Sequence, residues 1–136
     1  MRNLSSAIIY DDKWKILVVD KPKENWKVIT ILPWWKIDNW ETEEQALQRE
    51  LSEELWILNI QIIKKIWDIL WESPTLWIKS KINLFEIEIP NNSVFTTTAE
   101  VGNPRFLTKD EILELTTTTQ LTKNCINKIL KYNIWK

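Results

Sequence analysis

The chain has 136 residues, 44% hydrophobic and 27% charged, as expected for one globular domain with a substantial core. Its 18 basic and 19 acidic side chains nearly cancel, which argues against a nucleic-acid polymer as partner. No stretch approaches the roughly 18 to 20 apolar residues of a membrane span, and the N-terminal segment has no secretory apolar core. We therefore expect a single cytoplasmic domain over residues 1–136, without a membrane partner.

The order of the predicted elements indicates an α/β protein. Strands are predicted at 5–10, 15–20 and 28–32, then a helix at 42–55, strands at 60–70, 78–89 and 105–107, and helices at 110–115 and 122–134. Strands and helices interspersed in this way predict a mixed sheet covered by helices.

The glycine and tryptophan counts are unusual. The chain has one glycine and ten tryptophans, whereas average usage predicts about ten glycines. Trp14, Trp26 and Trp40 lie in polar, turn-like segments, where a positive φ is often needed and Asn-Gly is the usual solution. We interpret most of the tryptophans as occupying positions whose backbone geometry suits glycine. The alternative is a surface that is naturally rich in tryptophan.

The predicted helix at 42–55 carries the most specific pattern in the chain. Thr42 followed by Gln45 fits a capping box at its start. Apolar residues recur at four-residue spacing and predict a buried stripe, formed by Leu47, Leu51 and Leu55.

Three acidic residues of this helix have the spacing i, i+3, i+4. Glu50, Glu53 and Glu54 therefore fall within an arc of roughly 100°. Carboxylates this close repel one another unless a cation lies between them, and ligation by oxygen alone suits Mg²⁺ or Mn²⁺. Arg49 can orient one of the acids through a bidentate pair. The alternative is a solvated acidic face of a helix.

The spacing over residues 35–57, WKIDNWETEEQALQRELSEELWI, resembles the Nudix box. In that pattern a glycine is followed, after five residues, by Glu and, after seven more, by Arg-Glu. An aliphatic residue, any residue, Glu-Glu, any residue, glycine and an aliphatic residue complete it. Every position other than the glycines matches, and Trp35 and Trp56 stand at the two glycine positions.

The resemblance implies a Nudix-like α/β/α sandwich with a mixed β-sheet between helices. It also implies a hydrolase that uses Mg²⁺ or Mn²⁺ to cleave the diphosphate linkage of a nucleoside diphosphate derivative. The substrate is then a small nucleotide, either a nucleoside triphosphate or a compound like ADP-ribose. Pro74, in a Ser-Pro segment beyond the box, resembles the downstream proline of ADP-ribose pyrophosphatases, although a lone proline is also an ordinary turn former.

By the same resemblance, Glu50, Glu53 and Glu54 hold the divalent metals. The backbone carbonyl of Trp35, or of its neighbour Trp34, supplies a further ligand.

The resemblance gives the remaining site residues supporting or catalytic roles. Arg49 positions Glu50, and Glu41 supports the loop before the helix. One carboxylate acts as base, either from the box, such as Glu53, or from a later loop. Glu100 is the candidate in that loop, and an exposed loop acid without a role is the alternative.

The departures from the pattern leave a second function open. Two indoles at Trp34 and Trp35 crowd the loop that approaches metal and phosphate, and Trp56 stands where a helix usually ends in a left-handed glycine. We expect the double change Trp35→Gly and Trp56→Gly to raise thermal stability. If the loop blocks the metal site, the chain is instead a catalytically silent module of the same fold that binds a nucleotide or a protein.

Two phenylalanines have alternative interpretations as well. Phe85 and Phe106 are candidates to stack on a base, but residues that alternate along a strand are more often part of the core.

Overall fold

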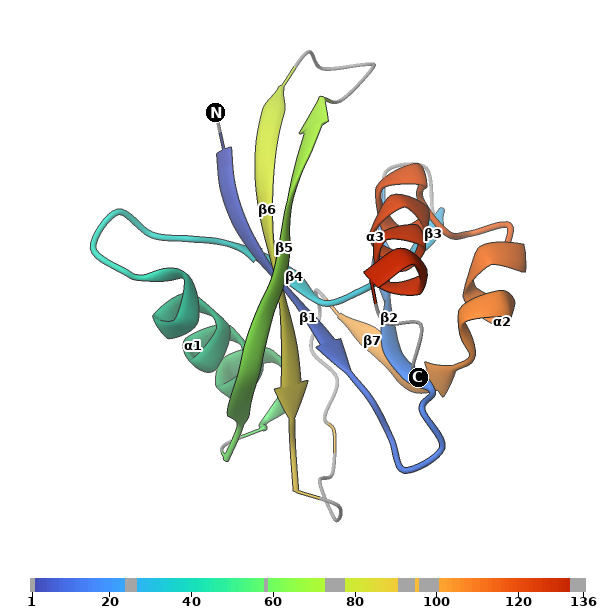
Figure 1. Cartoon of the computed structure of the whole chain (residues 1–136), viewed down its shortest axis with the longest axis horizontal. Helices are drawn as coiled ribbons and strands as arrows, with labels where there is room; N and C mark the ends of the chain where they lie inside the picture. The colour runs from blue at the N-terminus through green and yellow to red at the C-terminus, as the bar shows by residue number, and fades with distance from the viewer. Residues whose placement is uncertain are drawn as a thin grey trace.

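Two β-sheets form the middle layer of the protein (Figure 1). The structure is a computed structural model, and it describes residues 2–23, 27–57, 59–72, 78–90, 95 and 101–132. The four-stranded sheet has the order β4 (Trp34–Lys36), β1 (Arg2–Ile9), β6 (Lys79–Glu88), β5 (Gln61–Glu72). The three-stranded sheet has the order β3 (Val28–Ile31), β2 (Ile16–Pro22), β7 (Gly102–Leu107). Strands β1 and β6 are parallel and the other pairs are antiparallel, so the larger sheet is mixed.

Helices cover both sides of this layer. Helix α1 (Glu43–Leu55) lies on one side, and α2 (Lys109–Glu114) and α3 (Gln120–Tyr132) lie on the other (Figure 1). The predicted α/β/α sandwich with a mixed sheet is thereby confirmed. None of the helices in the described part of the chain combines the length and hydropathy needed to traverse a bilayer.

The period-two alternation of β1 places side chains in two hydrophobic clusters. Ala7 and Ile9 face the cluster that contains the leucine stripe of α1. Leu4 and Ile8 face the opposite cluster, which contains Ile126 of α3. One strand thus joins both helical layers to the sheet, and the stripe predicted for α1 is buried as expected.

The elements predicted from the sequence are present with ends shifted by up to three residues. Strand β4 was not predicted; its residues were expected to form a loop. It has only three residues and pairs with Leu4, Ser5 and Ser6 of β1, a partner distant in the sequence. A strand this short carries too few residues to show an alternation of its own.

The backbone separates the tryptophans into two groups. Trp14 and Trp56 have φ of 61° and 58°, so the prediction of a left-handed backbone is confirmed at both. It is wrong at Trp40, which is not among the described residues with positive φ. Trp35, at the first glycine position of the pattern, is extended in β4. Trp26 lies outside the described residues.

Candidate active site on helix α1

The first turn of α1 is fixed by a capping box. The Gln45 amide donates to Thr42 Oγ1 at 3.1 Å, and the Thr42 amide donates to Gln45 Oε1 at 2.9 Å. This confirms the cap predicted from the sequence. The helix ends at Trp56, whose amide donates to the Leu51 carbonyl, and Ile57 donates to the same oxygen. Both ends are therefore closed by hydrogen bonds. The buried leucine stripe faces the core and sets the direction of the acidic face.

Arg49 connects the acidic residues of the box. Its Nε and Nη2 donate to the two carboxylate oxygens of Glu41 at 2.6 and 2.8 Å. Its Nη1 donates to Glu50 at 2.7 Å and lies 3.4 Å from Glu53, while Nη2 lies 3.3 Å from Asp38. We call Asp38, Glu41, Arg49, Glu50 and Glu53 the Arg49 cluster.

Glu41 is the most enclosed acid of this cluster, with a side chain 5% exposed. Besides the Arg49 guanidinium, it accepts a hydrogen bond from the Asp38 amide at 3.0 Å. The charge-assisted bonds from Arg49 lower the pKa of Glu41 to about 2. Glu41 therefore stays ionised and anchors the guanidinium that holds Glu50.

The cluster carries more negative than positive charge. One guanidinium contacts four carboxylates, those of Asp38, Glu41, Glu50 and Glu53. Burial raises the pKa of Glu50 even though Arg49 donates a hydrogen bond to it, so the guanidinium does not fully compensate this carboxylate. A further cation beside Glu50 would relieve the excess charge.

The donor chemistry fits a hard divalent cation. Glu50, Glu53 and Glu54 offer oxygen ligands only, on adjacent turns of one helix. In the part of the chain that the structure describes, no three acidic, histidine or cysteine side chains converge on one point as a bound metal requires. Glu53 is exposed and contacts Arg49 only at 3.4 Å, so it can turn toward a cation at the small cost of a rotamer change.

A small cavity lies between Glu54 and the two tryptophans of β4. A cavity of about 20 Å³, room for a single water, is lined by Glu54, Trp34 and Trp35 together with Lys21 and Val101. The Lys21 ammonium lies 4.8 Å from the centre of the Trp34 ring. Trp34 is half-buried, Trp35 is buried in the core next to α1, and both line this cavity.

The structure brings most of the residues predicted for the site close to α1. Arg49, Glu50 and Glu53 belong to one cluster, and Glu54 lines a cavity with Trp35. Glu100 and Pro74 lie outside the described residues, so their roles stay predictions.

Asp38 joins the cluster without having been predicted. The sequence did carry a signal for it: an acid three residues before Glu41, in a turn that the bond from the Glu41 amide to the Asp38 carbonyl closes at 3.0 Å.

The two phenylalanines named as stacking candidates differ in position. Phe85 is 1% exposed and lies in the core, so it cannot stack on a ligand in this conformation. Phe106 is half-buried and lines a larger cavity described below.

Of the comparisons with known proteins, only the one with solved structures found similar proteins. No protein-family model and no curated protein matches the sequence. A NUDIX hydrolase from Nitrosomonas europaea superposes with a TM-score of 0.80 at 17% identity, covering 96% of this chain and 88% of the other. The Nudix fold is the fold of this chain. At this identity the likeness shows the fold and not the activity.

Two other solved structures also superpose on nearly the whole chain. A Caenorhabditis elegans Ap4A hydrolase, solved as a binary complex, has a TM-score of 0.78 at 15% identity, with 100% of both chains covered. The NUDIX domain of NrtR from Shewanella oneidensis, complexed with ADP ribose, has a TM-score of 0.74 at 16% identity, covering 96% of this chain and 87% of the other.

Proposed function

We propose that this chain belongs to the Nudix hydrolase family and hydrolyses the diphosphate linkage of a nucleoside diphosphate derivative with the help of Mg²⁺ or Mn²⁺. The Arg49 cluster carries the proposal. One guanidinium joins Glu41, Glu50 and Glu53 at the spacing of the Nudix box, on a helix of the Nudix fold. A solvated acidic face would not require a nearly buried Glu41 to hold the arginine from the preceding loop.

In this proposal Glu50, Glu53 and Glu54 hold the cation, with the Trp35 carbonyl as a further ligand. When bound, the cation neutralises phosphate charge and lowers the pKa of a water. Arg49 keeps Glu50 oriented, because Glu41 fixes the guanidinium from its other side. The proton of the attacking water passes to a carboxylate oxygen, that of Glu53 or of Glu100.

The same proposal also indicates a broad class of substrates. Ap4A and ADP ribose, which appear with the two structurally similar proteins, both contain a phosphoanhydride bond between adenosine and a second group. We therefore propose nucleoside triphosphates, dinucleoside polyphosphates and ADP-ribose-like compounds as the panel to test.

The test is hydrolysis of this panel with Mg²⁺ or Mn²⁺, with products separated by anion-exchange chromatography. We expect Glu53→Gln to lower kcat by about 10²-fold or more. Glu44→Gln is the matched control, because Glu44 is an exposed acid on the same helix outside the Arg49 cluster. Equal activity of the two variants would contradict the roles given to the cluster.

One observation favours the second candidate, a catalytically silent binding module. The cavity beside Glu54 has room for a single water, and Trp34 and Trp35 are among the residues that line it. A module would bind members of the panel in calorimetry yet release no product at any concentration of either metal. Turnover that depends on Glu53 would exclude it.

A further inference from the structure

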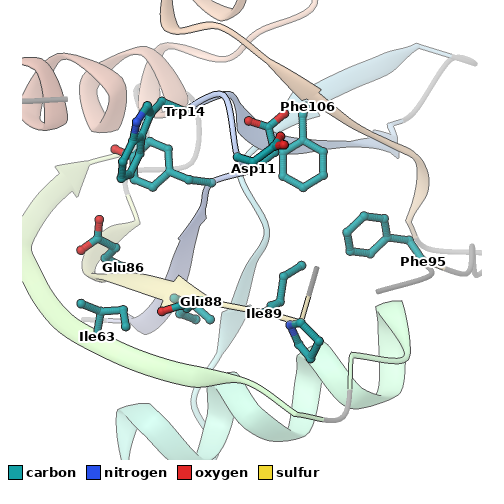
Figure 2. A pocket seen from close by; sticks show the side chains of 12 residues that line it. Asp11, Trp14, Ile63, Glu86, Glu88, Ile89, Phe95 and Phe106 are labelled. Atoms are coloured by element: carbon teal, nitrogen blue, oxygen red, sulfur yellow. The ribbon is translucent and has the colours of Figure 1, made fainter. Parts of the chain in front are cut away.

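A larger cavity lies away from the Arg49 cluster. It has a volume of about 600 Å³, within the range of small-molecule sites, and opens where β6 ends, beside the turn between β1 and β2 (Figure 2). None of its lining residues belongs to the Arg49 cluster or to the acidic face of α1. A ligand here would occupy a site separate from the one proposed for diphosphate hydrolysis.

Aromatic rings form two walls of this cavity. Tyr10 and Trp14 pack edge to face with centroids 5.2 Å apart, and Phe95 and Phe106 pack tilted at 5.9 Å. Figure 2 shows Trp14 on one side of the cavity and Phe95 on the other. Trp14 lines the cavity and is 52% exposed, so its side chain is accessible to solvent. Aromatic faces attract cations through the ring quadrupole.

The charged groups among the described lining residues are all carboxylates. Asp11, Asp12, Glu86 and Glu88 line the cavity, and no lysine or arginine is among its described lining residues. Glu86 is only 5% exposed, on a strand in the middle of the larger sheet. Asp11 is held in place by hydrogen bonds from the amides of Lys13 and Lys15 to its Oδ1. Carboxylates that line a cavity repel a phosphate and favour a cation.

We propose that this cavity binds a small organic cation with a flat or apolar body, such as a quaternary ammonium or an N-alkylated aromatic ring. The aromatic rings pack against the apolar body of the ligand and attract its cationic group, and the carboxylates favour a positively charged ligand over a neutral one. Volume, aromatic walls and charge of one sign are separate properties of the same cavity, and together they define this class of ligand.

The test compares two probes of similar shape by isothermal titration calorimetry: N-methylquinolinium and uncharged 2-methylquinoline at mildly alkaline pH. We expect the cation to bind about tenfold more tightly. We expect Glu88→Gln to weaken the cation several-fold and leave the neutral probe unchanged, because Glu88 is an exposed lining residue whose replacement spares the core. Phe106→Leu is expected to weaken both probes.

Glu72→Gln is the matched control, because Glu72 is an exposed acid at the far end of β5 and does not line the cavity. Failure of the cation to bind, equal affinity for both probes, or equal effects of Glu88→Gln and Glu72→Gln would overturn the proposal. The outcome is independent of the hydrolase test, which uses anionic substrates and variants of α1.

Discussion

The two tryptophans at the glycine positions of the box differ in almost every respect. Trp35 opens the box in an extended strand, 7% exposed and packed in the core with the leucines of α1. Trp56 closes it at the end of α1, 66% exposed, with a φ of 58°. The same substitution relative to the pattern therefore stabilises the protein at one end and strains it at the other.

Backbone conformation and burial determine whether a tryptophan stabilises or strains the protein at each of these positions. An extended backbone accepts any side chain, so the buried indole of Trp35 contributes its full apolar area. A left-handed backbone costs a side chain about 1–2 kcal/mol, and the exposed indole of Trp56 recovers little of that cost. From the sequence we expected that replacing both tryptophans by glycine would raise stability. From the structure we expect glycine to lower stability at position 35 and to raise it at position 56.

The largest expected effect is that of Trp35→Gly. It removes a buried indole from the cluster around α1 and should lower the free energy of unfolding by about 3–5 kcal/mol. Urea unfolding followed by circular dichroism measures it. Trp35→Phe, which keeps an aromatic ring in the core, should cost much less; similar losses for both would mean that the indole is poorly packed.

Trp56→Gly should have the opposite sign and a smaller size. Glycine accepts the left-handed conformation without a clash, so we expect a gain of about 1 kcal/mol in the same unfolding experiment. Trp56→Ala serves as control, because alanine keeps the strain and should gain almost nothing. A loss of stability in the glycine variant would show that the indole makes contacts that outweigh the strain.

Trp14→Gly tests whether relief of a left-handed backbone raises stability at a second tryptophan as well. Trp14 has a nearly equal φ of 61°, but its ring packs against Tyr10. Loss of that pair, worth about 0.5–1.5 kcal/mol, should offset most of the relief. We expect a net change within about 0.5 kcal/mol of zero; a gain as large as that of Trp56→Gly would mean that the Tyr10 contact adds nothing.

The last prediction concerns pH and Glu41, which lies between Trp35 and Trp56 in the sequence. The folded pKa of Glu41 is about 2, below its ordinary value of 4.5, because Arg49 donates to its carboxylate. Its contribution to stability is therefore complete above pH 4.5 and is lost as the pH falls toward 2. Glu41→Gln should flatten this part of the stability profile, measured by urea midpoints from about pH 6 to about pH 3. Glu44→Gln should leave the slope nearly unchanged.

Much of α1 could be predicted because its signals are local. The capping box needs only Thr42 and Gln45, and the leucine stripe follows from helical spacing. The left-handed end at Trp56 was predicted because a helix terminus imposes its own geometry. Each of these features depends on residues within two turns of one another.

Strand β4 and the place of Asp38 could not be predicted in the same way. Strand β4 forms because β1, about 30 residues earlier in the chain, offers it hydrogen-bonding partners. Asp38 reaches Arg49 only because the turn before α1 folds back over the helix. Neither the pairing of β4 with β1 nor the contact of Asp38 with Arg49 produces a periodic pattern in the sequence.

The sequence by itself determined the helix, its caps and the acidic spacing, because these depend on interactions between neighbours along the chain. Tertiary structure decided which tryptophan is buried and which is strained, since φ and exposure at Trp35 and Trp56 depend on what packs against each. It also decided that aromatic rings from β7 and from the turn between β1 and β2 share one acidic cavity, because only the packing of the two sheets brings these distant segments together.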